Sequence, residues 1–181
     1  MAPCRPVIQA VRCAPRRDGR LAKILRILSP FPIVVGVARK EEATMSKVKG
    51  NGSEASPWAL KTPPGTSEFE AWRDAEGETP ALVVQVGKTQ LRYHLRCIED
   101  LHLMLKKHGD WMPLGSADEQ KAAGEGTVEA WGRSGKNPVK GWYGIKKGLR
   151  GRFGMYVPPV LEALGLAEVE HNPKNNRMRA K

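Results

Sequence analysis

Basic and aromatic side chains alternate with glycine between residues 134 and 154. This stretch contains Lys136, Lys140, Lys146, Lys147, Arg150 and Arg152, with Trp142, Tyr143 and Phe153 among them. Lysine and arginine contact the phosphate oxygens of nucleic acids, and an aromatic ring between them can stack on a base. A mobile surface loop is the alternative interpretation. We predict a nucleic-acid-binding surface here, formed by Lys146, Lys147, Arg150, Arg152 and Tyr156.

The C-terminal segment contains a second basic motif. Residues 172–176 have the composition of a turn, and short strands are predicted on both sides of it, at 167–171 and 177–180. Such a hairpin can lie along a groove or strand of nucleic acid. A solvated loop is again the alternative, because asparagine, proline and lysine suit turn geometry alone. The predicted contacts are Lys174, Asn175, Asn176, Arg177 and Arg179.

The net charge of +11 is unevenly distributed along the 181 residues. Residues 1–44 carry +6, residues 45–135 carry −2 and residues 136–181 carry +7. A nearly neutral middle followed by a basic end indicates that one surface meets a polyanion. Solubility alone is the other explanation for the charge. The prediction therefore depends on the two basic stretches lying side by side in the folded chain.

Other kinds of chemistry lack the residue spacing that they need. The four histidines have no metal-ligand spacing, and the glycines form neither a dinucleotide-binding nor a Walker motif. Glu125 and Glu129 are interpreted as a solvated helix face, and no nucleophile with a partner base is found. The three cysteines, Cys4, Cys13 and Cys97, fit neither a disulfide framework nor a zinc finger. We expect no catalytic residue, metal or cofactor, and a cytoplasmic protein without a membrane-spanning helix.

Several elements that position the basic stretches have clear local patterns. Residues 81–86 and 89–95 predict a hairpin whose turn has Gly87 at its first position. Residues 96–108 predict a helix ended by Gly109, and 127–133 predict a short helix. A further helix is predicted over 155–164, with Pro158 and Pro159 in its first turn. Residues 58–65 predict an extended lead-in, and 67–74 either a short helix with a capping box or a short strand.

The N-terminal segment is predicted to lie outside the fold. Residues 1–40 are rich in arginine and poor in acids, which is typical of organellar transit peptides. A secretory leader fits less well because of Pro30 and Pro32, and translation starting at Met45 is a third interpretation. We predict a disordered or dispensable extension over 1–56 and a single domain over 57–181.

The predicted order over residues 96–181 is helix, strand, helix, helix, strand, basic loop, strand. Residues 160–169, with a leucine-rich helix turning at Gly165-Leu166, and the tip at 172–179 resemble the winged-helix DNA-binding superfamily, including regulators of the multiple-antibiotic-resistance type. In those proteins the hairpin is a wing with an arginine-bearing tip. The helix before Gly165 departs from the pattern, because it is short and contains prolines. As a whole, 57–181 is also similar to an uncharacterised family of small bacterial proteins.

These observations predict an α+β fold in which a β-hairpin precedes a winged-helix-like helical part that ends in a C-terminal β-hairpin. The resemblance implies a non-catalytic protein that binds nucleic acid, with DNA favoured over RNA. The alternative is a protein-interaction or scaffold module, with a protein partner or a second copy of the chain, that binds no nucleic acid. No membrane partner is expected.

Overall fold

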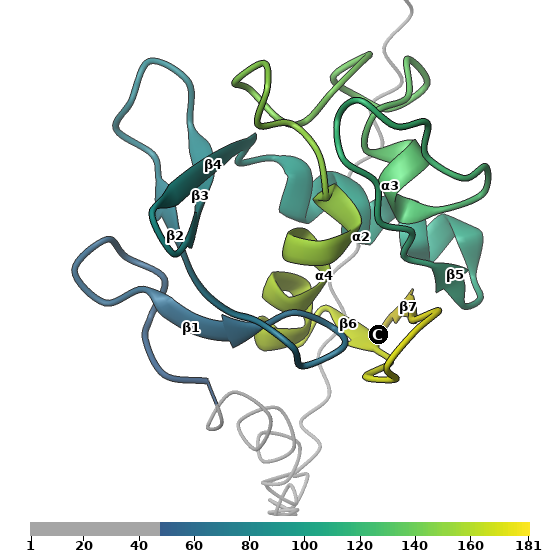
Figure 1. Cartoon of the computed structure of the whole chain (residues 1–181), viewed down its shortest axis with the longest axis horizontal. Coiled ribbons are helices and arrows are strands. Elements are labelled where there is room, and N and C mark those ends of the chain that lie inside the picture. Colours follow the sequence, from purple (N-terminus) through teal and green to yellow (C-terminus); the bar gives the residue numbers. More distant parts are fainter. Residues whose placement is uncertain (1–47) are drawn as a thin grey trace, which may run out of the picture. The chain divides into compact units, whose positions relative to one another are not determined.

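The computed structural model describes residues 48–181, which form two antiparallel sheets and three helices (Figure 1). The interpretations of residues 1–47 as a leader, or as sequence before a start at Met45, lie outside the described residues. The elements in chain order are β1 (Trp58–Lys61), β2 (Glu68–Asp74), β3 (Ala81–Val86), β4 (Thr89–His94), α2 (Cys97–His108), β5 (Met112–Pro113), α3 (Val128–Trp131), α4 (Phe153–Ala163), β6 (Ala167–Val169) and β7 (Arg177–Ala180).

The first sheet is a meander with the strand order β1-β2-β3-β4. Its β3–β4 hairpin confirms the predicted one, and Gly87 has the positive φ of 56° that the turn requires. The helical interpretation of residues 67–74 is wrong, because this segment is β2. It pairs with β1 on one side and with β3 on the other, and Phe69 and Ala71 alternate inward. Pairing on both sides outweighs the local capping signal.

The second sheet has the strand order β5-β7-β6 and packs with α2 and α4. Together with the first sheet it confirms the α+β class and the C-terminal hairpin. α4 begins at Phe153, two residues before the predicted start. Pro158 and Pro159 therefore lie inside the helix, and their predicted place in its first turn is wrong.

α4 lies in the middle of the fold, between the first sheet and the other helices (Figure 1). It contacts β1, β6, α2 and α3. Eight of its eleven residues are buried, which places Val157, Val160 and Leu161 in the common core. A helix covered on several sides in this way is apolar around its circumference, so its amphipathic pattern in the sequence is weak.

A column of aromatic rings joins the first sheet to the helices. Tyr93 of β4 meets Phe153 edge-on at 5.8 Å, and Phe153 stacks on Tyr143 at 5.4 Å, which stacks on Trp131 at 5.3 Å. The Tyr93 hydroxyl donates to the Gly151 carbonyl at 2.9 Å, and the Tyr143 hydroxyl donates to Asp100 Oδ2 at 2.8 Å. The column therefore satisfies its polar atoms while it fills the core.

The segment before Trp58 already packs on the first sheet. Gly52 lies against the Trp58 indole, and its carbonyl accepts a hydrogen bond from the Arg73 amide at 2.9 Å. The Ala59 amide donates to the Lys49 carbonyl at 3.1 Å. Residues 48–56, which lie within the predicted N-terminal extension, thus continue the meander beside β1.

Burial raises the pKa of Tyr93 and of Tyr143 above the ordinary value of 10.0, and the nearby Asp100 carboxylate raises that of Tyr143 further. A raised pKa gives stability that is complete below pH 10 and is lost as the pH rises above it. We expect the 295-nm absorbance of these two tyrosinates to appear only together with cooperative unfolding. In the variant Tyr143→Phe, the increase in 295-nm absorbance on unfolding should be smaller by the contribution of one tyrosinate. Ionisation of either residue near pH 10 in the folded protein would contradict their burial.

Alanine substitutions at two glycines distinguish two ways of lowering the free energy of unfolding, a strained backbone conformation and a steric clash. Gly109 ends α2 with a φ of 75°, and a Cβ there would meet nothing within 4 Å, so Gly109→Ala should cost about 1 kcal/mol. A Cβ on Gly154 would collide with the Leu114 carbonyl oxygen, so Gly154→Ala should cost about 3 kcal/mol through forced displacement. Urea unfolding of both variants measures the two free energies. Equal losses would show that the close approach at Gly154 is wrong.

Candidate nucleic-acid interface

The predicted cations divide into lysines and arginines, and three of the four arginines form ion pairs inside the domain. Arg152 contacts Asp118 at 2.7 Å, Arg177 contacts Glu170 at 2.6 Å and Arg179 contacts Glu168 at 2.6 Å. The hydrogen bond from Arg152 lowers the pKa of Asp118, and the one from Arg177 lowers the pKa of Glu170. Exposed pairs of this kind add little stability, but they fix where the side chains lie.

The hairpin arginines also pack on a tryptophan. The guanidinium carbons of Arg177 and Arg179 lie 5.5 Å and 4.8 Å from the ring centre of Trp111, just before β5. Arg179 lies opposite Glu168 in the β6–β7 register. The two arginines thus join three strands through stacking and charge, which is a structural role within the second sheet.

The lysines of the same regions are exposed and have a different environment. Within residues 48–181, no carboxylate lies within 4 Å of their ammonium groups. They are Lys136, Lys140, Lys146, Lys147 and Lys174. Four of the five lie in one segment, residues 134–150, which is called the lysine loop from here on. The lysine loop therefore presents cations that protein acids do not neutralise in the described part of the chain.

The backbone of the lysine loop is fixed by internal contacts. The buried Asn137 amide donates to the carbonyls of Trp131 and Gly141 at 2.9 and 2.7 Å. Residues 143–145 add to the free edge of β4, through amide-to-carbonyl bonds of 2.9 Å from His94 to Tyr143 and from Ile145 to Arg92. The lysine side chains consequently project from an ordered frame, which reduces the entropy lost when they bind.

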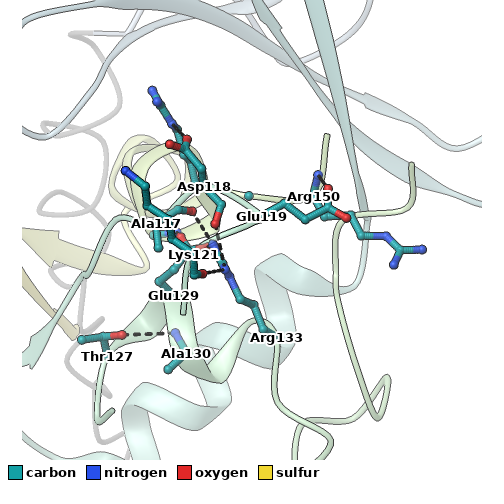
Figure 2. A network of polar contacts seen from close by, with 12 residues as sticks. Ala117, Asp118, Glu119, Lys121, Thr127, Glu129, Ala130, Arg133 and Arg150 are labelled. Carbon is teal, nitrogen blue, oxygen red and sulfur yellow. Dashed lines mark hydrogen bonds and ion pairs between the residues drawn. The ribbon is translucent and has the colours of Figure 1, made fainter. Parts of the chain in front are cut away.

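A buried ion pair between Glu129 and Arg133 lies just before the lysine loop in the sequence and next to the 117–121 loop in space (Figure 2). The Glu129 side chain is fully buried and that of Arg133 is 9% exposed. Arg133 donates to Glu129 and to the carbonyls of Ala117, Asp118 and Lys121, and Glu129 Oε2 accepts from the Gly154 amide at 2.7 Å. The interpretation of Glu129 as a solvated helix residue is therefore wrong. Arg133, which stands four residues later in the sequence and just after the end of α3, is the signal that indicates a paired glutamate.

Arg133 also reaches the lysine loop itself. Its guanidinium lies 4.5 Å from the ring centre of Trp142, which stands between Lys140 and Lys146 in the sequence. Trp142 is partly buried beneath this cation, and Tyr143 is fully buried in the aromatic column. The tyrosine therefore offers no open face for a base to stack on.

The remaining predicted residues have structural contacts. Tyr156 is buried edge-on against Phe69, at 5.3 Å. Asn176 is buried and closes the hairpin loop through two hydrogen bonds with the Asn172 backbone, at 2.6 and 2.8 Å. The Arg150 amide donates to Glu119, and its partly buried guanidinium lies near the Ile145 carbonyl. Asn175 is exposed, with a φ of 56° at the hairpin tip.

Most of the predicted residues line two grooves, groove A and groove B. Each groove has a volume of about 700 Å³. Groove A is lined by Lys147, Arg152 and Tyr156 together with the acidic residues Asp118 and Glu119. Groove B contains Lys174, Asn175, Asn176 and Arg177 beside Met155. The 115–120 loop contributes residues to both grooves. The two basic stretches thus lie along two grooves, with acidic side chains of this loop next to the first.

The burial of α4 limits its contacts with the bases of a DNA duplex. A recognition helix needs exposed side chains that enter the major groove. No residue of α4 is fully exposed, and its Tyr156 face is covered by Phe69 of β2. The first sheet therefore covers a helix face that would have to be open for base contacts.

The described residues show neither a metal-binding cluster nor a reactive cysteine. Residues 48–181 contain no group of three or more histidine, cysteine or acidic side chains placed to hold a metal ion. The buried Cys97 thiol has a pKa raised by desolvation, which makes it a poor nucleophile. What the geometry offers is a fixed, cationic loop on an α+β domain.

The sequence comparisons place this domain in a family. The chain belongs to the Family of unknown function (DUF6855), whose model matches residues 50–181. This agrees with the predicted similarity to an uncharacterised family. Neither the curated proteins nor the solved structures contain a match to the chain. Among the described residues, no helix is both long and apolar enough to cross a membrane.

Removing one charge of the buried Glu129–Arg133 pair should lower the free energy of unfolding substantially. Glu129→Gln keeps the side-chain shape but leaves Arg133 buried without a carboxylate, so the free energy of unfolding should fall by about 3 kcal/mol. Glu125→Gln is the matched control, because Glu125 is exposed in the preceding loop and should change stability by less than about 0.5 kcal/mol. Urea unfolding compares the two. Similar small losses would mean that Glu129 is accessible to water.

Proposed function

We propose that this protein binds nucleic acid without reading its sequence, through phosphate contacts made by the lysine loop. The observation that carries the proposal is the set of four exposed lysines, Lys136, Lys140, Lys146 and Lys147, with no carboxylate of the described residues within 4 Å. Unneutralised cations on an ordered backbone suit a polyanion, because each phosphate contact releases a condensed counterion. No catalytic step is part of this function.

The arrangement of the C-terminal part supports a relationship to winged-helix proteins. The order α2, β5, α3, α4, β6, β7 and the sheet order β5-β7-β6 agree with the element order on which the resemblance was based. Duplex DNA is the preferred ligand for this reason. Because α4 is covered by the first sheet, the affinity comes from the backbone of the duplex and the sequence preference is weak.

The residues that we propose to contact phosphate are the lysines of the lysine loop, and the arginines of the sequence-based prediction are left out. Arg152, Arg177 and Arg179 contact carboxylates of the domain, and phosphate would have to replace those partners. Four lysine contacts give a log–log salt slope of about −3.6. Between 50 and 200 mM salt the affinity for duplex DNA should therefore fall on the order of a hundredfold.

The test compares two variants of the full chain that have the same net charge. In the first, Lys136, Lys140, Lys146 and Lys147 are replaced by alanine. In the second, Lys88, Lys106, Lys107 and Lys121 are replaced, which are equally exposed and form no ion pair within residues 48–181. Fluorescence anisotropy with a labelled duplex and a labelled single strand is measured over a salt series.

The lysine-loop variant should lose most of the salt slope, and the control variant should keep it. If the two variants lose affinity and slope equally, binding follows overall charge and the proposed surface is wrong. Absence of binding to duplex and to single strands at 50 mM salt by the unaltered protein would overturn the function itself.

A further inference from the structure

We propose that groove B binds an extended segment of a partner protein in which a carboxylate stands next to an apolar side chain. This inference is independent of the lysine loop, which lies outside groove B. It follows from the lining of the groove, its charge and its fixed walls.

The lining of groove B is mainly apolar. Pro63 and Pro64 come from the turn after β1, Pro113 from β5, Met155 from the first turn of α4 and Pro173 from the hairpin tip. Segments far apart in the sequence thus place carbon surface around one hollow of about 690 Å³. Proline rings have no backbone donor to satisfy and little freedom to lose, so they suit a preformed apolar binding surface.

The charge of groove B has one sign. The described residues that line it include Lys174 and Arg177 but no aspartate or glutamate. Arg177 is bound to Glu170, whereas Lys174 is exposed and has no carboxylate of residues 48–181 within 4 Å. A single unneutralised cation beside apolar surface matches one carboxylate beside one apolar side chain. A nucleic-acid backbone would require several such cations.

The walls of groove B are held by specific hydrogen bonds. The Thr62 amide donates to the Ser67 carbonyl at 2.9 Å, which fixes the turn that contains Pro63 and Pro64. The His171 imidazole lies 3.1 Å from the Pro63 carbonyl oxygen and 3.0 Å from the Glu162 carboxylate, so it links that turn to the hairpin and to α4. A partner therefore meets a formed groove rather than one that must be assembled.

The hairpin wall is fixed in the same way. The Asn176 side chain closes the loop onto Asn172, and the Asn176 carbonyl accepts from the Leu114 amide at 2.9 Å. The second contact joins the hairpin to the end of β5. Asn175 at the tip has a left-handed φ of 56°, which asparagine tolerates better than most residues. The position of Lys174 beside the groove follows from this closed loop.

The experiment selects random dodecapeptides displayed on phage against the immobilised full chain, with counter-selection on the bare support, and the selected peptides are then tested on the variant Met155→Glu. Met155 is the third residue of α4, where a glutamate favours the helix dipole, so the variant should fold. The selected peptides should carry aspartate or glutamate next to a large apolar residue. Synthetic copies of these peptides are then measured by fluorescence anisotropy.

We expect Met155→Glu to weaken peptide binding at least about tenfold and Lys174→Glu about fivefold. Leu103→Glu is the matched control, since Leu103 is a 56% exposed apolar residue on α2 outside groove B, and it should leave binding unchanged. Peptides in which asparagine or glutamine replaces the acidic residue should also bind more weakly.

Three outcomes overturn the proposal. The first is no enrichment over the bare support, and the second is enriched peptides without an acidic residue. The third is peptide binding that survives in Met155→Glu but is lost when the four lysines of the lysine loop become alanine. That last result would assign the peptides to the cationic loop instead of groove B.

Discussion

The buried ion pair between Glu129 and Arg133 joins α3 and the turn after it to the 117–121 loop and to the start of α4. Removing two charges from water is costly, and the cost is offset only where the remaining donors and acceptors find partners. Here Arg133 reaches three carbonyls of the 117–121 loop, and Glu129 accepts the Gly154 amide at the start of α4. The pair thereby positions the 115–120 loop that borders both grooves, and Arg133 also stacks on Trp142 of the lysine loop.

The division of labour between arginine and lysine follows from their chemistry. A guanidinium is planar, donates in a fixed fork and stacks on aromatic rings, which suits the contacts with Glu168, Glu170 and Trp111. An ammonium group is compact and strongly hydrated, so it stays at the surface. Arg177 and Arg179 hold the β6–β7 hairpin, and Arg152 holds Asp118 in the 115–120 loop. The lysines of the lysine loop remain exposed to solvent. A strongly basic segment can therefore expose fewer available charges than its composition suggests.

Elements with complete local signals could be predicted from the sequence. The β3–β4 hairpin needs only alternation and a glycine at its turn, and α2 needs only its apolar period and Gly109. β2 and the start of α4 could not be predicted in this way. β2 is decided by pairing with strands on both sides. α4 begins at Phe153, and the amide of its second residue, Gly154, donates to Glu129, which lies 25 positions earlier in the sequence.

The sequence by itself determined the α+β class, the two basic stretches and the lack of metal or nucleotide spacing, because each of these is a property of residue types at short separation. Only the tertiary structure decided which cations remain available. The ion pairs of Arg152, Arg177 and Arg179 join residues 7 to 34 positions apart, and the two basic stretches line different grooves. Coulomb attraction and burial depend on distance in space, and that distance exists only after the sheets have packed around α4.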